Sequence, residues 1–126
     1  MASSLPYEIS CDSTANLLRI RLSGSIDARN MQACVDEIEK GLHTLRPPFK
    51  VLTDLSGIQN MDTACIPKVK HMMDLCRTKG VQTVVRVIPN RSKDVGFNIL
   101  SFFHYPQKVQ ILTFTTLAEA EQALAG

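Results

Sequence analysis

Hydrophobic and polar residues alternate in two short segments near the start of the chain. Residues 7–11 and 18–22 each place every second side chain on an apolar face, and a turn-rich stretch separates them. This alternation is typical of half-buried strands, so the two segments are predicted to form a β-hairpin. Arg19 and Arg21 fall on the polar face of the second strand and are expected to face solvent.

Helical spacing replaces this alternation after Asp27, which is a suitable N-cap residue. Apolar residues recur on one side of residues 28–45 and again on one side of residues 66–79. Between them, residues 49–55 have the apolar character of a buried strand, and residues 56–61 are expected to turn. The sequence leaves two alternatives for the start of the second helix. Either the helix begins at Thr63, or residues 62–65 form a loop or strained turn and the regular helix begins near Pro67.

The rest of the chain continues to alternate strands and helices. Residues 81–88 are β-branched and apolar, a helix is predicted after Ser92, residues 109–114 form the last strand, and Thr116 and Glu119 make a capping box for a C-terminal helix. The order β-β-α-β-α-β-α-β-α predicts an α/β fold with four helices and a mostly parallel five-stranded sheet whose first strand is antiparallel. The length favours a single domain over residues 1–126. The side chains predicted to be buried are Met31, Val35, Ile38, Val51, Leu52, Val69, Met73, Val85, Val87, Ile99, Phe102 and Ile111.

Composition narrows the classes of function. Apolar residues make up 44% and charged residues 21% of the chain, as in a globular protein, and a net charge of +2 is too small to suggest nucleic acid as the main partner. No apolar run approaches the ~20 residues that a membrane span needs. Residues 1–6 lack the features of a signal peptide, and the four cysteines form no C-x-x-C pair, so reduced thiols in a cytoplasmic protein are expected.

Polar residues come near the ends of the predicted strands, at the edge where α/β folds usually place their sites. Asp27, Asp54 and Asp62 fall near the C-terminal ends of successive strands, and Arg91 and Lys93 come after the next one. These five residues are predicted to form an edge that contacts a partner or a ligand.

Thr63 is the candidate for modification. It directly follows Asp62 at the predicted start of a helix, where a hydroxyl is expected to be exposed. A phosphate added there would be stabilised by the positive end of the helix dipole.

The order of elements resembles the STAS domain, the fold of bacterial anti-sigma factor antagonists. Residues 24–27 are similar to the glycine-x-hydrophobe-aspartate turn of that family, residues 51–64 to its strand and phosphorylation loop, and residues 80–85 to its glycine-led strand. The phosphoacceptor of the family is a Ser or Thr directly after an Asp, which Thr63 matches, and Asp62-Thr63-Ala64 is similar to the form in stressosome proteins. The resemblance implies a bacterial, cytoplasmic, non-enzymatic signalling module that binds a protein partner, kinase-like or other, and is switched by phosphorylation at Thr63.

Two chemical alternatives are weaker. An enzyme would use Cys65 as a nucleophile with His71 or His104 as its base, but no spacing places a histidine beside Cys65, so a buried structural thiol is the better interpretation. The three histidines and four cysteines have no metal-ligand spacing, and no glycine-rich phosphate loop is present, so neither a metal nor a cofactor is expected.

The alternative function is binding of a lipid or other apolar molecule under the predicted helix of residues 97–105. Phe97 and Leu100 fall outside the inner stripe of that helix. They are predicted to form an apolar contact patch that serves a partner interface or a homodimer.

Overall fold

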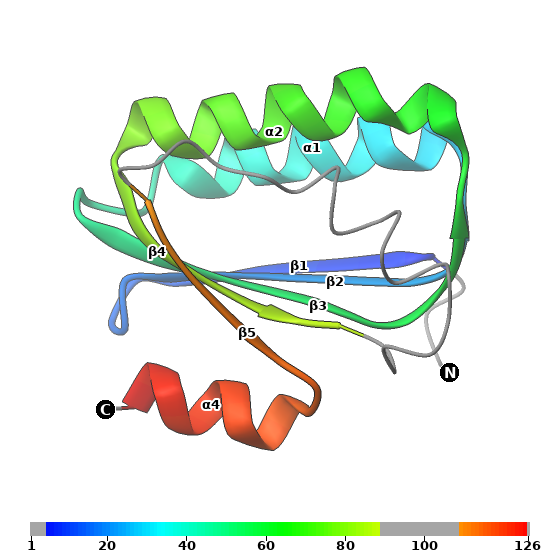
Figure 1. Ribbon diagram of the computed structural model, residues 1–126. Helices are drawn as coiled ribbons and strands as arrows, with labels where there is room; N and C mark the ends of the chain where they lie inside the picture. The colour runs from blue at the N-terminus through cyan, green and yellow to red at the C-terminus, as the bar shows by residue number, and fades with distance from the viewer. Residues whose placement is uncertain (1–4, 89–108, 126) are drawn as a thin grey trace.

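The computed structural model of the protein describes residues 5–88 and 109–125. Its centre is a five-stranded sheet with the strand order β1-β2-β3-β4-β5 (Figure 1). The first strand pairs antiparallel with the second and all other neighbours are parallel, so the predicted mixed α/β sheet is confirmed. The strands are β1 (Tyr7–Asp12), β2 (Leu17–Ile26), β3 (Phe49–Met61), β4 (Val81–Val87) and β5 (Gln110–Phe114).

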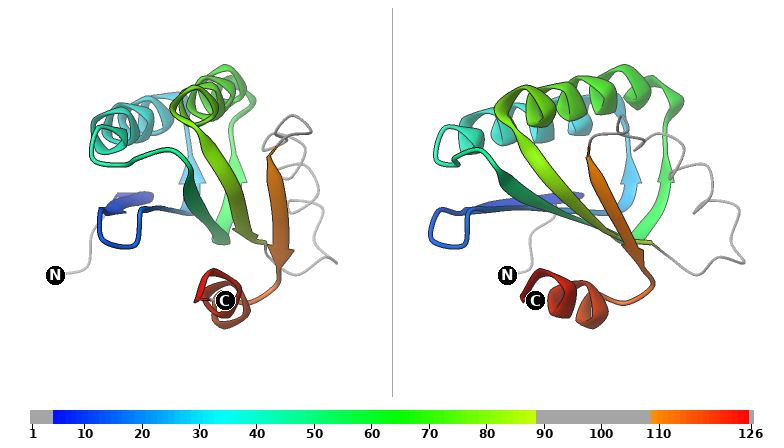
Figure 2. Two further views of the ribbon diagram at one scale, coloured as in Figure 1. Left: turned by 90° about the vertical axis from the view of Figure 1, so that its left-hand side faces the viewer. Right: turned by 60° about the vertical axis from the view of Figure 1, so that its left-hand side comes forward.

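Helices cover the two faces of the sheet unequally. α1 (Ala28–Leu42) and α2 (Ile66–Lys79) lie side by side over one face, and α4 (Leu117–Ala125) lies against part of the other (Figures 1 and 2). The described residues thus contain three α-helices, because the fourth helix predicted after Ser92 lies outside them. The sheet carries one core toward α1 and α2 and a second, smaller core toward α4.

The predicted core is largely confirmed. Ile111 is only half-buried, because β5 is the last strand of the described sheet, and Ile99 and Phe102 lie outside the described residues. The other predicted side chains are buried: Met31, Val35, Ile38, Val51, Leu52, Val69, Met73, Val85 and Val87.

The start of the second helix follows the second of the two predicted options. A short 3-10 helix, η1 (Thr63–Cys65), comes first, and α2 begins at Ile66 with Pro67 in its first turn. Proline is tolerated there because the first N–H groups of a helix have no partner within the helix. Asp62 caps η1: its side chain accepts a hydrogen bond from the backbone N–H of Ala64 at 3.0 Å.

The turn predicted for residues 56–61 is wrong, because β3 continues as a strand to Met61. The polar residues of this stretch pair with the end of β2, which also runs past Leu22 to Ile26. The register shifts twice, between Arg21 and Ser23 and between Gly24 and Ser25 of β2, so β3 carries extra residues there. Such bulges bend a strand, and β3 curves at this end toward the layer of helices (Figure 1).

Arg19 lies on the outer face of β2 as predicted, but it is only partly exposed because it contacts α4. Its guanidinium forms a two-pronged ion pair with Glu121 of α4, and one of the two bonds joins Nη2 to Oε2 at 3.0 Å. Arg21 is exposed, as predicted. The outer face of β2 therefore holds the C-terminal helix through one arginine and leaves the other accessible.

Candidate functional site

The ends of β2 and β3 bring the starts of two helices together. Ile26 and Met61 are the last paired residues of the two strands, and the backbone N–H of Asp62 donates to the carbonyl of Ile26 at 2.9 Å. The residue that follows each strand, Asp27 or Asp62, is the N-cap of α1 or η1, and the two helix starts lie at the same end of the molecule (Figure 1). We call this region the helix-start surface and define it by Asp27, Asp62 and Thr63.

Asp27 caps α1. Its carboxylate accepts a hydrogen bond from the backbone N–H of Asn30 at 2.8 Å, and the Asn30 side chain accepts one from the backbone N–H of Asp27 at 3.4 Å. This reciprocal pair is a capping box, and a negative charge at this position is favoured by the helix dipole. The carboxylate is nevertheless exposed, so its charge contributes to the helix-start surface.

Thr63 is exposed at the first position of η1. The N–H groups that follow it are already used, because Ala64 donates to the Asp62 carboxylate and Cys65 donates to the Asp62 carbonyl at 2.9 Å. The carbonyl of Thr63 in turn accepts the N–H of Ile66. The hydroxyl is thus accessible to another protein, while the backbone around it is held by its own hydrogen bonds.

Cys65 lies directly beneath this surface. Its side chain is buried, and its thiol donates to the carbonyl of Ile26 at 3.6 Å. Burial raises the pKa of this thiol above its ordinary value, and the negative charges of Asp62 and Asp27 raise it further. A thiol held in its protonated form is a poor nucleophile, so these surroundings favour the structural interpretation of Cys65.

The side chain of Lys68 lies at the border of the helix-start surface. Lys68, in the first turns of α2, donates from Nζ to the side-chain carbonyl of Gln32 on α1 at 2.8 Å. This bond ties the two helices together beside their starts. The helix-start surface therefore combines two exposed carboxylates and one exposed hydroxyl with a lysine at its border.

Asp54 does not join this surface. Because β3 is longer than predicted, Asp54 lies in the middle of that strand, only 8% exposed, and its Oδ1 accepts bonds from the backbone N–H and the hydroxyl of Ser56 at 3.0 and 2.6 Å. Its register partner on β2 is Arg21. The structure therefore brings Asp27 and Asp62 together and places Asp54 elsewhere.

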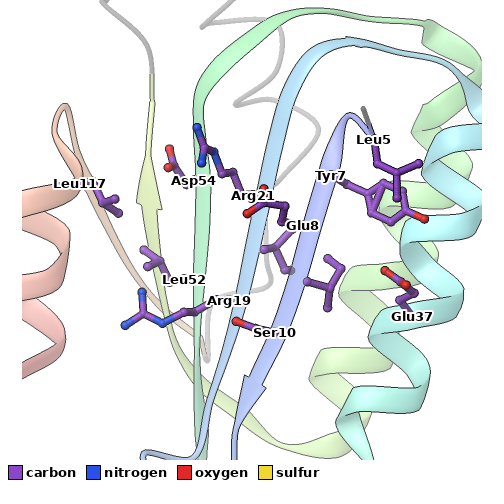
Figure 3. Close-up of a pocket in the computed structure, with 12 residues that line it drawn as sticks. Leu5, Tyr7, Glu8, Ser10, Arg19, Arg21, Glu37, Leu52, Asp54 and Leu117 are labelled. Atoms are coloured by element: carbon purple, nitrogen blue, oxygen red, sulfur yellow. The ribbon is translucent and has the colours of Figure 1, made fainter. Parts of the chain in front are cut away.

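Asp54 instead borders a hollow of about 480 Å³ on the outer face of β1–β3 (Figure 3). Arg21 lies there between Glu8 and Asp54, because these three residues share one row of the sheet. Leu5 and Leu117, which are 52% and 44% exposed, also line the hollow and are the large exposed apolar side chains of the described residues. The sequence predicts that Arg21 faces solvent, but its alternation does not show that Glu8 and Asp54 flank this arginine.

The remaining predicted site residues cannot be placed. Arg91, Lys93, Phe97 and Leu100 lie outside the described residues, as does the helix that was expected to cover an apolar ligand. Within residues 5–88 and 109–125, no group of three or more metal-ligating side chains gathers. No helix in the same part of the chain is long and apolar enough to cross a membrane.

Comparison with known proteins gives a family and a fold. A family model described as STAS domain matches residues 8–120. No curated protein has a significant sequence match to the chain. Several solved structures are similar in fold at low sequence identity.

An uncharacterised protein with a SpoIIAA-like fold from Shewanella loihica matches with a TM-score of 0.68 and 15% identity, over 98% of each chain. The phosphorylated form of the Bacillus cell fate determinant SpoIIAA matches with a TM-score of 0.64 and 14% identity, over 94% of this chain and 98% of that one. A complex of the diguanylate cyclase SiaD with its activator SiaC from Pseudomonas aeruginosa contains a chain that matches with a TM-score of 0.56 and 14% identity, over 89% of this chain and 93% of the other.

Proposed function

Because this chain belongs to the STAS domain family, we propose that it is a non-enzymatic regulatory module that binds a protein partner at its helix-start surface. Two structural neighbours support this role. SpoIIAA is described as an anti-sigma factor antagonist, and the SiaC protein is described as the activator of a cyclase with which it forms a complex. The partner of this chain is accordingly a kinase-like or other signalling protein.

The exposure of Thr63 directly after Asp62 is the observation that carries the proposed switch. A phosphate on its hydroxyl adds about −1.5 to −2 charges at pH 7. Asp62 and Asp27 are both exposed beside it, so phosphorylation makes this surface strongly acidic. A partner docked there is repelled, and the module releases it.

The effect of the phosphate is electrostatic and leaves the fold in place. The nearest N–H groups already donate to Asp62, so a phosphate has few free donors to capture and little cause to rearrange the backbone. Thr63 is also outside both cores. Phosphorylation therefore changes the charge of a preformed surface and switches binding off.

The test starts from a partner captured with the wild-type protein from a lysate of its native host and identified by mass spectrometry. Its affinity is then measured for wild type, Thr63→Ala and Thr63→Glu. We expect Thr63→Ala to bind like wild type and Thr63→Glu to bind more weakly. Thr78→Glu is the matched control, because Thr78 is exposed near the other end of α2 and its substitution adds the same charge away from the surface.

Circular dichroism confirms that the variants are folded. If Thr63→Glu binds as tightly as wild type, and protein from the native host carries no phosphate on Thr63, the switch is wrong and the module binds its partner constitutively. If Thr78→Glu weakens binding as much as Thr63→Glu, the partner does not dock specifically on the helix-start surface.

A lipid or other apolar ligand is the second candidate, and the hollow of the outer sheet face is the observation that favours it. Leu5, Leu52 and Leu117 give this hollow an apolar lining next to Arg21. Organic extraction of purified protein followed by mass spectrometry is the test. We expect wild type to release a ligand that Leu117→Ser retains less well, and an empty extract from wild type would remove this candidate.

A further inference from the structure

The strand β1 forms an open edge of the sheet. It pairs with β2 on one side, and no strand of the described residues lies on its other side (Figure 2). The carbonyl of Pro6 accepts a hydrogen bond from the N–H of Ser23 at 2.8 Å. This bond identifies which residues of the hairpin turn their N–H and C=O groups toward the neighbouring strand. In an antiparallel pair every second residue turns its N–H and C=O away from its neighbour. The residues of β1 that do so are Tyr7, Ile9 and Cys11.

This edge lacks several of the devices that usually protect an unpaired strand, and its charged residues are Glu8 and Asp12. The pairing of β1 with β2 continues without a bulge over the whole of Tyr7–Asp12, and the strand contains neither lysine nor proline. Proteins commonly use such residues and bulges to prevent edge-to-edge pairing. The edge of β1 is therefore suited to accept another strand.

We propose that the strand it accepts is the β1 of a second copy of this chain, paired antiparallel about a twofold axis at Ile9. In this register Ile9 faces the partner's Ile9, and Tyr7 faces the partner's Cys11. Each facing pair exchanges two backbone hydrogen bonds. The two sheets join into one continuous sheet.

The positions of the acidic residues of β1 favour this register over the two neighbouring ones. With the axis at Ile9, Glu8 faces the partner's Ser10. An axis one residue earlier places Glu8 against the partner's Glu8, and one residue later it places Glu8 against the partner's Asp12. Like charges directly opposite each other destabilise a strand pair.

The adjacent helix supplies a matching pair of charges. Glu37 and Lys40 of α1 are both exposed, and both line a shallow hollow of about 300 Å³ that also includes Ile9 and Cys11. Neither of them makes an ion pair with any other residue of the described chain. They are thus free to interact across the open edge.

The order of these charges along β1 is self-complementary. Glu37 lies toward the Tyr7 end, where its charge acts on the Tyr7 hydroxyl. Lys40 lies toward the Cys11 end, next to Gly41, whose backbone packs so closely on Cys11 that an added Cβ would lie 2.4 Å from the sulfur. The twofold axis at Ile9 therefore places Glu37 opposite the partner's Lys40 and repeats this contact by symmetry.

Dimerisation at this edge leaves both helix-start surfaces accessible. Each surface follows the end of β2 that pairs with Tyr7, and the antiparallel arrangement sends the two surfaces to opposite ends of the joined sheet. The dimer can hold two partners at once, or one partner that is itself a dimer through two contacts.

Sedimentation of the full chain over a range of concentrations tests the proposal. Wild type is expected to sediment as a dimer that dissociates on dilution. Glu37→Lys and Lys40→Glu each replace two attractive contacts by repulsive ones and should raise the dissociation constant about tenfold or more. The double variant Glu37→Lys/Lys40→Glu restores opposite charges and should restore the dimer.

The backbone is tested separately by Ile9→Pro. The N–H that this variant loses points away from β2, so the hairpin ladder is kept while the strand pairing across the axis is broken. We expect a folded monomer by circular dichroism and sedimentation, whereas the control Ile9→Val stays a dimer. The proposal is overturned by a wild type that is monomeric at every soluble concentration, by a folded Ile9→Pro that still dimerises, or by charge reversals that leave the dissociation constant unchanged. If Ile9→Pro does not fold, the charge-reversal series decides.

Discussion

A single side chain connects the first hairpin to the loop before β3. Asn16, in the turn between β1 and β2, donates from Nδ2 to the carbonyls of Arg46 and Pro48 at 2.7 and 2.9 Å. Its Oδ1 accepts the N–H of Arg46 at 2.9 Å. Its φ of +55° is in the left-handed region, which asparagine tolerates better than most residues. The turn and the loop are therefore held in place by one amide group.

We expect Asn16→Ala to lower the free energy of unfolding by about 1–3 kcal/mol, because it removes these hydrogen bonds and places a less tolerant residue at positive φ. Asn16→Gly loses the same bonds but adopts this φ readily, so its loss should be smaller. Urea unfolding of the three proteins measures both effects. Equal unfolding midpoints for wild type and Asn16→Ala would show that the amide contributes nothing to stability.

Residue-level predictions from the sequence succeeded where the reason was local. Asp27 as an N-cap and the exposure of Thr63 both depend on neighbours within one or two turns of the chain. The role of Asn16 depends on a loop that lies thirty residues away along the chain. The composition of the turn identified it as a turn, but nothing in the sequence pattern indicated the partners of its amide.

At the scale of elements, β3 shows why one boundary was predicted wrongly. Its last residues are polar and include glycine, which is the usual composition of a turn. They remain a strand because the equally polar end of β2 pairs with them, and strand preference depends strongly on such neighbours. Because the predicted strand ends too early, the prediction places Asp54 at its end instead of in its middle. It therefore groups Asp54 with Asp27 and Asp62, whereas the structure brings only Asp27 and Asp62 together.

The helix α4 is held to the sheet by the ion pair of Arg19 with Glu121 as well as by its small core. The hydrogen bonds from Arg19 lower the pKa of the Glu121 carboxylate below its ordinary value of 4.5. A group whose pKa is lower in the folded state stabilises the fold at pH values above its unfolded pKa. This stabilisation is lost as the pH falls through the lower, folded value.

Glu121→Gln is therefore expected to be less stable than wild type at pH 7, and the difference should shrink as the pH falls below about 4.5. Because both side chains are 41% exposed, the difference at pH 7 should be less than about 1 kcal/mol. Urea unfolding at a series of pH values measures it. Glu39→Gln on the exposed side of α1 is the control for the loss of one carboxylate that makes no ion pair among the described residues. A Glu121→Gln difference that is the same at pH 7 and pH 3 would contradict this account of the ion pair.

At the scale of the whole molecule, the sheet separates two cores that do not share side chains. Ile38 of α1 belongs to the larger core under α1 and α2, whereas Leu52 of β3 belongs to the smaller core under α4. Both side chains are almost completely buried. The sequence predicted both as core residues, but its alternation alone could not say which helix covers which face.

Ile38→Ala and Leu52→Ala should each lower the free energy of unfolding by about 2–5 kcal/mol, because each leaves a cavity in a packed core. Since the two cavities lie on opposite faces of the sheet, the loss in the double variant should equal the sum within about 0.3–0.5 kcal/mol. Denaturant unfolding of the two single variants and the double variant gives the three values. A coupling above about 1 kcal/mol would mean that the sheet transmits strain between its faces.

The two bulges at the end of β3 have a further consequence for how related proteins can differ in length. A bulge holds a residue that has no direct partner, so one residue can be lost or gained there while the pairing before it is preserved. Between Asp54 and Gly57, two residues of β3 lie opposite the single residue Leu22 of β2, so the loss of Ser56 would remove a bulge while the pairs on both sides of it are kept. The end of β3 is therefore a point at which a residue can be lost without redesign of the cores, in the segment that leads to the exposed Thr63.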